Sequence, residues 1–178
     1  MATLYIVRHG ETEENHRHVL QGQLPGTLTD EGRRQVAEAA KRLVEMKAAC
    51  SQIISSDLKR AIDSAGIIAS KLHLPIVPMP LLRERDWGEF NGMPIDEARE
   101  RFLHDGEWVF PPDTVETEDA VYQRAKDALL ALARTCHGDS AVVVTHGLFA
   151  RNLIAAHFGL SPRMVKPLEN AEVRILEL

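Results

Sequence analysis

The chain has 178 residues, 44% of them hydrophobic and 26% charged, and a formal net charge of −5. This length suits one domain with its own core, residues 1–178, and the acidic balance argues against nucleic acid or an anionic membrane as a partner. No apolar stretch reaches transmembrane length and no signal-peptide pattern is visible, so we expect a cytoplasmic protein. The two cysteines, Cys50 and Cys136, follow no metal-ligand spacing, which fits a reduced compartment.

The first predicted strand is the apolar run at residues 4–7, which ends in Arg8-His9-Gly10. In an open α/β sheet, ligands bind at the carboxyl ends of the strands, so these three residues stand where chemistry is expected. Arginine offers a planar fork for phosphate, histidine a nucleophile or base near neutral pH, and glycine a close approach of the backbone. The tripeptide alone is a weak signal, and a strand end with a surface histidine is the plainer interpretation.

The rest of the chain alternates between predicted strands and helices. Residues 11–26 are polar with little periodicity, which predicts a long binding loop, and Thr29 then caps a helix that reaches about Ala48. Later strands are expected at residues 53–55, 74–78, 141–144 and 172–176. Later helices are expected after a cap at Ser56-Asp57, from Pro94 to about 102, over 117–133 and from about 148, where Phe158 joins the apolar positions. Residues 108–113 are expected to be irregular.

This alternation predicts an α/β fold, a three-layer sandwich in which a mostly parallel sheet carries helices on both faces. The run at residues 141–144 is wholly apolar, as expected of a strand that is covered on both sides. The last strand alternates polar and apolar residues, so we expect an antiparallel edge strand at the C-terminal end.

Two predicted strand ends carry the same dipeptide, His9-Gly10 and His146-Gly147. The carboxyl ends of parallel strands share one edge of the sheet, so both histidines are expected to line one crevice. Arg60 comes early in a predicted helix, where the helix N-terminus and the guanidinium favour an anion. Together with Arg8, these residues predict a compact cationic pocket that suits a phosphoryl group.

The motifs in order resemble the histidine phosphatase superfamily, in its phosphoglycerate-mutase-like branch. The resemblance spans nearly the whole chain. The matching positions are Arg8-His9-Gly10-Glu11-Thr12 with Asn15, Gln21-Gly22, Leu28-Thr29 with Gly32, Ser55-Ser56-Asp57-Leu58 with Arg60-Ala61, Leu82 and Glu84 with Gly88 and Gly92, and Val144-Thr145-His146-Gly147. Short bacterial members of this kind include α-ribazole phosphatases and broad-specificity phosphatases.

The resemblance implies a role for each matching position. His9 is the implied nucleophile that forms a phosphohistidine, with its other ring nitrogen donating to a backbone carbonyl. Arg8, Arg60 and His146 are implied to hold the phosphoryl oxygens. Glu84 is the implied general acid, which then activates water. The remaining implied substrate contacts are Asn15, Gln21, Gly22, Gly147 and Leu148.

Plainer interpretations of the same residues stay open at this stage. Glu84 lies in a charged run that suits a solvated surface, and Arg60 could be an exposed helix arginine. Asn15 could only stabilise a turn, and His146 could cap its own helix.

The chain also departs from the family pattern at three places outside the implied phosphate pocket. Ser64 stands where threonine is common, Val115-Glu116-Thr117 replaces a Gly-Glu-Ser segment, and Asn91-Gly92 stands where Glu-Gly is frequent. The second departure puts the local loop shape in doubt, and the third puts the leaving-group contacts in doubt.

We therefore expect a metal-independent phosphomonoester hydrolase that needs no cofactor and acts on a small phosphorylated metabolite such as α-ribazole 5′-phosphate. The alternatives are phosphoglycerate mutase activity and a catalytically weak protein that binds phosphorylated ligands. A chain of 178 residues leaves little room for the added segments that cover the substrate in the longer mutases. A metal-dependent mechanism is disfavoured because the sequence lacks a dense cluster of metal ligands, and a homodimer is left open.

Overall fold

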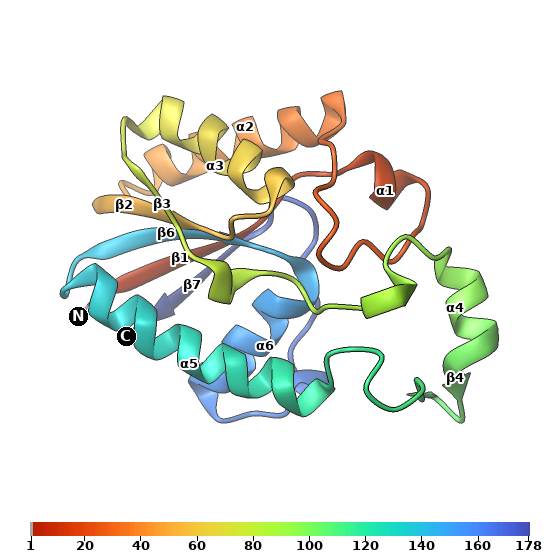
Figure 1. Ribbon diagram of the computed structural model, residues 1–178. Helices are drawn as coiled ribbons and strands as arrows, with labels where there is room; N and C mark the ends of the chain where they lie inside the picture. The colour runs from red at the N-terminus through yellow and green to blue at the C-terminus, as the bar shows by residue number, and fades with distance from the viewer. Residues whose placement is uncertain (1) are drawn as a thin grey trace.

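A five-stranded sheet forms the centre of the computed structural model, which describes residues 2–178 (Figure 1). The strand order is β3-β2-β6-β1-β7. The strands are β1 (Thr3–Arg8), β2 (Cys50–Ser55), β3 (Ile76–Pro78), β6 (Ser140–Thr145) and β7 (Val173–Glu177). The first four run parallel, whereas β7 pairs antiparallel with β1 at the edge. The predicted α/β class and the antiparallel C-terminal edge strand are both confirmed.

Helices cover both faces of this sheet (Figure 1). Helices α2 (Asp30–Glu45) and α3 (Lys59–Leu72) lie on one face, and α5 (Glu118–Cys136) and α6 (Gly147–Phe158) lie on the other. Thr29 caps α2 through a bond from the Gly32 N–H, and Thr117 caps α5 in the same way through Ala120.

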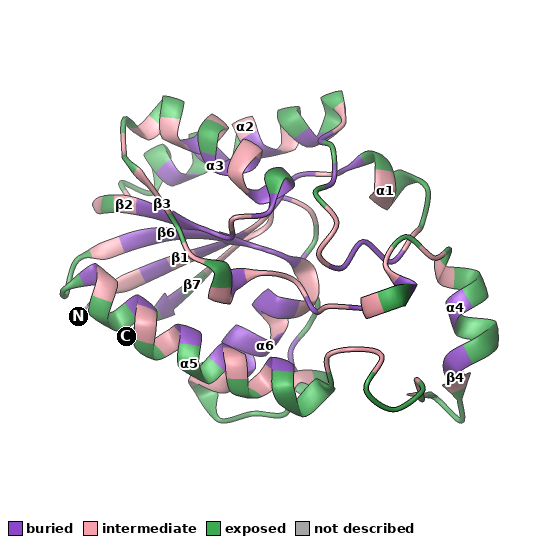
Figure 2. Ribbon diagram, viewed as in Figure 1, coloured by how far each residue is buried: buried purple, intermediate pink, exposed green. Residues whose placement is uncertain are grey.

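The strands are apolar on both sides because each side meets a separate helical layer. In β1, Ile6 belongs to the cluster under α5 and α6, whereas Val7 belongs to the cluster under α2 and α3. Val143 and Val144 divide in the same way in β6. The buried strands form the middle layer in Figure 2, and burial on both faces is what a parallel sheet of this kind requires.

A smaller lobe lies beyond the carboxyl ends of the parallel strands (Figure 1). It contains α1 (Glu13–His16), α4 (Ile95–Phe102) and a short hairpin of β4 (Leu103–His104) and β5 (Glu107–Trp108). Its own core joins five buried side chains, which are Leu20, Trp87, Phe90, Ala98 and Phe102. Three single 3-10 turns complete the secondary structure, at Pro80–Leu82, Gly88–Phe90 and Pro162–Met164.

Four predictions about local structure were wrong. Residues 11–26 are not a structureless loop, because Thr12 caps the short helix α1 with Asn15 as the reciprocal partner. Trp108 belongs to β5 rather than to an irregular segment. Helix α3 has no side-chain cap, since the Ser56 hydroxyl accepts from the Leu58 N–H before the helix begins. Phe158 ends α6 with 59% of its surface exposed.

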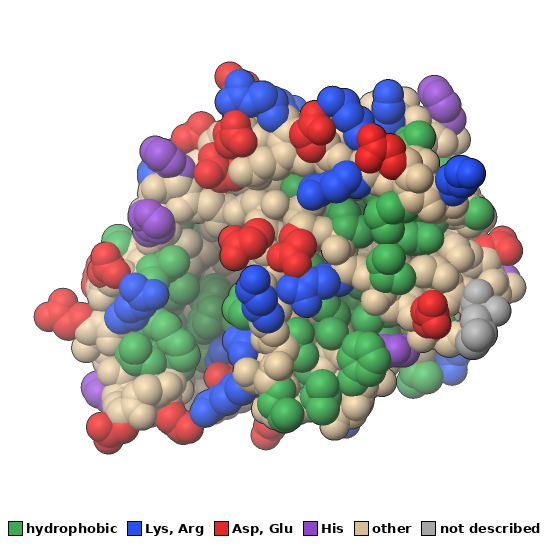
Figure 3. All heavy atoms as spheres, turned by 180° about the vertical axis from the view of Figure 1, so that it is seen from behind, with side chains coloured by type: hydrophobic (Ala, Val, Ile, Leu, Met, Phe, Trp, Pro, Cys, Tyr) green, Lys and Arg blue, Asp and Glu red, His purple; other side chains and the backbone are tan. Residues whose placement is uncertain are grey.

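The surface mixes charges of both signs, as the small net charge requires. In the rear view of Figure 3, acidic and basic side chains are interspersed and apolar side chains gather in the lower part. Within residues 2–178, no helix is both long and apolar enough to cross a membrane.

Candidate active site

The pairing of β1 with β6 brings the two predicted histidines together. The register pairs Arg8 with Thr145, so the residues that follow, His9 and His146, leave the sheet side by side. The His9 N–H donates to the Thr145 carbonyl at 2.9 Å. The two imidazole rings lie 5.2 Å apart between centroids, at 61° to each other. The two histidines therefore lie side by side as expected, but the expectation that both line one crevice is wrong, because only His9 lines the cavity described below.

Hydrogen bonds on both ring nitrogens settle the tautomer of His9. Nδ1 lies 2.7 Å from the Gly10 carbonyl oxygen, which can only accept, so Nδ1 carries the hydrogen. Arg60 donates its Nε–H to Nε2 at 3.2 Å, so Nε2 presents a lone pair. This arrangement confirms the expected bond from His9 to a backbone carbonyl and leaves a nucleophilic nitrogen on the Arg60 side.

The surroundings of His9 keep its ring neutral. The side chain is almost fully buried, and burial lowers its pKa well below 6.5 because a charged imidazolium loses its hydration. The positive charges of Arg60 and Arg8 lower the pKa further. A neutral imidazole is the form that can attack an electrophile.

Arg60 is a buried cation and not a surface residue of its helix. It is 1% exposed at the start of α3, and its guanidinium donates to the carbonyl oxygens of Leu24 and Gly22 as well as to His9. Burial lowers its pKa to about 10, which still leaves it charged at neutral pH. The carbonyl bonds fix the guanidinium between the loop after α1 and the His9 ring.

Arg8 supplies the second cation of the site. Its Nη1 donates to the Leu168 carbonyl at 2.7 Å, while its buried Nε has no partner among the described residues. Burial lowers its pKa, and the negative charge of Glu84 opposes this effect. The guanidinium lies against Gly147, where a Cβ would come within 3.2 Å of it, so a side chain at this position would crowd Arg8.

His146 lies behind His9 and does not line the cavity that His9 faces. It is fully buried, its Nε2 lies 2.8 Å from the Ser56 hydroxyl, and its Nδ1 has no hydrogen-bond partner within residues 2–178. Burial together with the charge of Arg60 lowers its pKa well below 6.5. His146 is the residue before the first turn of α6, but its side chain makes no capping hydrogen bond. The alternative that His146 only caps its own helix is therefore wrong.

Glu84 is held by backbone N–H groups and not left in solvent. Its Oε1 accepts from the N–H groups of Phe149 at 3.0 Å and Arg85 at 2.9 Å, and its Oε2 accepts from Leu148 at 3.1 Å. Two of these donors belong to the first turn of α6, where free N–H groups bind a carboxylate. The carboxyl group therefore has a fixed orientation at the edge of the site.

One cavity of about 120 Å³ joins most of the predicted residues. It is lined by Arg8, His9, Asn15, Gln21, Gly22, Arg60, Glu84 and Gly147, together with Val19, Leu20 and Trp87. The predicted contact residue Leu148 does not line this cavity. Its N–H donates to Glu84, and the residue lines a neighbouring, larger cavity. A neutral imidazole, two arginines and one carboxyl group in this volume suit a tetrahedral anion.

The polar residues of the first loop have different tasks. The Asn15 side-chain oxygen accepts from Thr12 and Asn170, so only its NH₂ group is available to donate to a ligand. The Gln21 oxygen accepts from the Thr12 hydroxyl at 3.0 Å, and the Gly22 carbonyl accepts from Arg60 at 2.8 Å. Gln21 and Gly22 therefore shape the cavity through the loop and through Arg60.

Gly10 serves helix packing rather than ligand approach. A Cβ on Gly10 would lie 2.3 Å from the Gly32 carbonyl oxygen in the first turn of α2. A Cβ on Gly32 would in turn lie 2.0 Å from the Glu11 carbonyl oxygen. The two glycines let α2 pack directly on the segment that carries His9.

The sequence pattern missed Asn170 at this site. Its side chain donates to the His9 carbonyl at 3.2 Å and to the Asn15 side-chain oxygen at 3.3 Å, and so joins β1 to the first loop. A signal was available, since an antiparallel edge strand begins at the sheet edge where the parallel strands end. Ser64 was noted only as a departure, yet its hydroxyl accepts from the Gly10 N–H at 3.2 Å.

Arg124 was missed as well, and it binds Glu116 of the Val115-Glu116-Thr117 segment. Its guanidinium forms a two-pronged ion pair with Glu116 at 2.7 and 2.8 Å and donates to the carbonyls of Leu81, Arg83 and Glu84. It also lies 4.4 Å from the centre of the Phe149 ring. No periodic pattern identifies an arginine nearly two turns inside a helix as a partner of a distant loop.

Asn91, the other departure, holds the loop beside the site. Its side-chain oxygen accepts from the Trp87 N–H at 3.3 Å, and its NH₂ group donates to Asp86 at 2.9 Å. It does not line the cavity that contains His9.

Comparison with known proteins identifies the family. The model of the histidine phosphatase superfamily (branch 1) matches residues 4–178. The chain belongs to this superfamily. It is 35% identical over 185 residues to phosphoglycerate mutase-like protein 4 of Arabidopsis thaliana, covering 99% of this chain and 80% of that protein. It is 31% identical over 164 residues to a Bacillus subtilis protein named uncharacterized phosphatase PhoE, covering 92% and 81%.

Solved structures agree with this membership. Bacillus stearothermophilus YhfR superposes with a TM-score of 0.87 at 28% identity, over 100% of this chain and 92% of that one. A mycobacterial glucosyl-3-phosphoglycerate phosphatase, solved with VO3, has a TM-score of 0.83 at 29% identity, over 99% and 93%. The chain is thus a phosphatase of the histidine phosphatase superfamily, as its motifs predicted.

Proposed function

We propose that this histidine phosphatase is a metal-independent phosphomonoester hydrolase that forms a phosphohistidine on His9. The observation that carries the proposal is the state of His9, a buried neutral imidazole whose Nε2 lone pair meets Arg60 in the small cavity. Arg8 and Arg60 supply the positive charge that a transferring phosphoryl group needs at its equatorial oxygens. The substrate is a small phosphorylated metabolite.

In the first half of the reaction, His9 Nε2 attacks phosphorus. A nitrogen–phosphorus bond forms, the bond from phosphorus to the ester oxygen breaks, and Glu84, acting as the general acid, gives a proton to the departing oxygen. The Arg60 Nε–H, which donates to His9 Nε2 at 3.2 Å, then donates to a phosphoryl oxygen instead. Asn15 contributes a neutral donor through its NH₂ group.

In the second half, a water molecule attacks the phosphohistidine. Glu84 accepts a proton from this water, the nitrogen–phosphorus bond breaks, and inorganic phosphate leaves. His146 acts from behind His9, where its neutral ring limits the positive charge in the pocket to that of the two arginines. The expected cytoplasmic location and the homodimer stay predictions.

Phosphoglycerate mutase activity is the second candidate, because one of the relatives is named phosphoglycerate mutase-like protein 4. The two activities separate in one assay that follows both phosphate release and isomer formation from 3-phosphoglycerate. Isomerisation faster than hydrolysis would overturn the hydrolase assignment.

The direct test is turnover of 4-nitrophenyl phosphate by the purified protein in the presence of excess chelator. We expect full activity with chelator and no gain on adding divalent metal. Activity that disappears with chelator and returns with metal would contradict the metal-independent mechanism. A panel that includes α-ribazole 5′-phosphate and phosphoserine then ranks the natural leaving groups by kcat/KM.

A further inference from the structure

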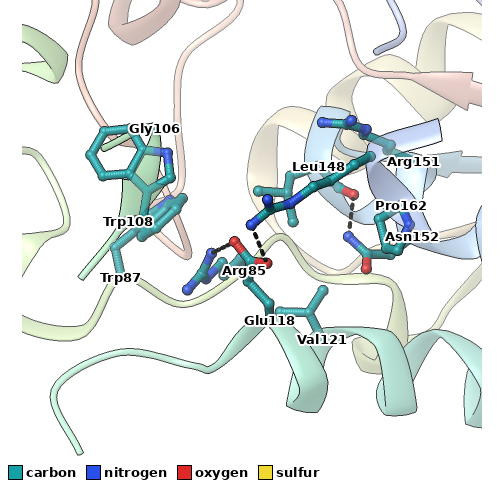
Figure 4. Close-up of a pocket in the computed structure, with 11 residues that line it drawn as sticks. Arg85, Trp87, Gly106, Trp108, Glu118, Val121, Leu148, Arg151, Asn152 and Pro162 are labelled. Atoms are coloured by element: carbon teal, nitrogen blue, oxygen red, sulfur yellow. Dashed lines mark hydrogen bonds and ion pairs between the residues drawn. The ribbon is translucent and has the colours of Figure 1, made fainter. Parts of the chain in front are cut away.

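A second, larger cavity lies next to the one that contains His9. It has a volume of about 290 Å³ and lies between the small lobe and helices α5 and α6 (Figure 4). Trp87 lines both cavities. Glu84 lines the smaller cavity, and the next residue, Arg85, lines the larger one. In the same way, Gly147 lines the smaller cavity and Leu148 the larger one. The two cavities are therefore adjacent, with three segments of the chain lining both of them.

The larger cavity combines flat aromatic walls with an excess of positive charge. The rings of Trp87 and Trp108 lie 6.4 Å apart at one side, and Leu148 and Arg151 lie opposite them in Figure 4. Three arginines line the cavity, Arg85, Arg151 and Arg163, against one lining carboxylate, Glu118. The lining thus carries a formal charge of +2.

Arg151 and Arg163 are only partly satisfied by the protein, whereas Arg85 donates its Nε–H to the Glu116 carbonyl oxygen at 2.8 Å and lies 4.4 Å from the centre of the Trp87 ring. Glu118 lies 3.8 Å from Arg85 and 3.9 Å from Arg163, too far for good hydrogen bonds. Arg163 also reaches Glu107 at 3.2 Å, but both side chains are more than 60% exposed, where water weakens the pair. The buried Nε of Arg151 has no partner among the described residues.

We propose that this cavity binds the leaving group of the substrate and selects an aromatic or heteroaromatic leaving group that carries a second anionic group. The inference rests on the proposed function, because the phosphoryl group is placed at His9 and the rest of the substrate extends past Trp87. The ring lies against the tryptophans, and the second anion meets Arg151 and Arg163. A guanidinium pairs with either a carboxylate or a phosphate, so the chemistry is that of an oxyanion on a flat ring.

Two matched substrates test the charge preference. The 4-carboxyphenyl and 4-carbamoylphenyl phosphates have nearly the same size and differ in the charge of the ring substituent. We expect kcat/KM to favour the carboxyl compound about tenfold, and a 4-(carboxymethyl)phenyl phosphate extends the series in length. A second series with a phosphate in place of the carboxylate distinguishes the two kinds of oxyanion. Equal kcat/KM for every charged and neutral pair would overturn the proposal.

Variants assign the preference to the cavity. Arg151→Gln and Arg163→Gln should each lower the ratio of kcat/KM between the carboxyl and carbamoyl substrates, and Glu118→Gln should raise it. Arg134→Gln is the matched control, since Arg134 is an exposed arginine of α5 outside the cavity. A ratio that moves equally in Arg134→Gln, or in none of the variants, would refute the assignment.

A binding measurement separates this proposal from the hydrolase assignment. The chain has two tryptophans, and both line the larger cavity, whereas Trp87 also lines the one that contains His9. A fluorescence change therefore reports ligand in either cavity, and Arg163→Gln assigns it to the larger one. We expect 4-hydroxybenzoate to change the fluorescence at lower concentration than 4-hydroxybenzamide, and Arg163→Gln to remove the difference. If neither phosphate ester is hydrolysed but the binding preference is present, the proposed function fails alone. If both esters are hydrolysed equally and binding shows no preference, the cavity proposal fails alone.

Discussion

The ion pair between Arg124 and Glu116 offers a sharp test of how the site is supported. Arg124 donates to the carbonyl oxygens of Leu81, Arg83 and Glu84, at 3.0, 2.7 and 3.3 Å, while Glu116 accepts two of its N–H groups. The guanidinium thus fixes the backbone of the segment that presents the Glu84 carboxyl group. The perturbation is Arg124→Met, which keeps an unbranched side chain of similar length and removes every donor.

The expected cost follows from the burial of the pair. The side chains of Arg124 and Glu116 are 18% and 17% exposed, between a surface pair and a fully buried one. Removing one partner of a buried pair costs about 3–5 kcal/mol, and a surface pair contributes about 0–1 kcal/mol. We therefore expect Arg124→Met to lower the free energy of unfolding by about 2–3 kcal/mol. For a chain of this size that corresponds to a fall in Tm of about 4–12 °C.

Activity should change selectively as well. The loss of the bonds to the Glu84 segment displaces the proposed general acid, so kcat should fall about tenfold for alkyl phosphates, whose leaving groups need a proton. It should fall much less for 4-nitrophenyl phosphate, whose leaving group departs unprotonated. Arg124→Lys, which keeps the charge and some donors, should recover part of the loss.

The assay combines urea unfolding with steady-state kinetics in a double-mutant cycle with Glu116→Gln. The two losses of stability should overlap by at least about 1 kcal/mol, because each change breaks the same pair. Arg34→Met is the control, since its pair with Glu31 is exposed and should contribute about 0.5 kcal/mol or less. Additive losses of stability, or equal slowing of alkyl and aryl substrates, would refute the reasoning.

Two further predictions concern packing and protons. Gly10→Ala should lower the free energy of unfolding by about 2–3 kcal/mol in urea, since its Cβ would lie 2.3 Å from the Gly32 carbonyl oxygen, whereas Gly66→Ala in the open middle of α3 should raise it by about 0.5–1 kcal/mol. The pKa values of His9 and His146 are lowered by burial, so the unfolded chain binds more protons than the folded one below pH 6.5. The stability that these residues contribute is complete above pH 6.5 and is lost as the pH falls from there towards their folded pKa values, by about 1.4 kcal/mol for each residue and pH unit. Urea midpoints between pH 7.5 and 5.5 measure this fall, and a flat profile would contradict neutral buried histidines.

The layers of the fold were predictable because strand and helix periodicity is local. The apolar run at residues 141–144 and the capping threonine at 29 each specify their own element without help from distant residues. The pairing of His9 with His146 also followed, since parallel strands end at one edge. The sequence therefore predicted the sheet, its coverage and the neighbouring positions of the two histidines, but not that His146 lies behind His9 outside the cavity.

The remaining features depend on contacts between segments far apart in the chain. The Asn15 side chain, which completes the cap of helix α1, also accepts a hydrogen bond from Asn170, 155 residues away. Arg124 reaches Glu84 across 40 residues. The β4–β5 hairpin is two residues long on each side and carries no alternating pattern. Such contacts are set by tertiary packing, which a local pattern does not encode.

The most direct test of the central claim is to trap the phosphorylated enzyme. Rapid alkaline quenching of turnover with a ³²P-labelled ester should give an acid-labile label in the peptide that contains His9. Because Nδ1 carries the hydrogen and Nε2 the lone pair, the label should be on Nε2. His9→Gln should remove both the label and turnover. A label on His146, on Nδ1 of His9 or on no histidine at all during steady turnover would contradict the mechanism.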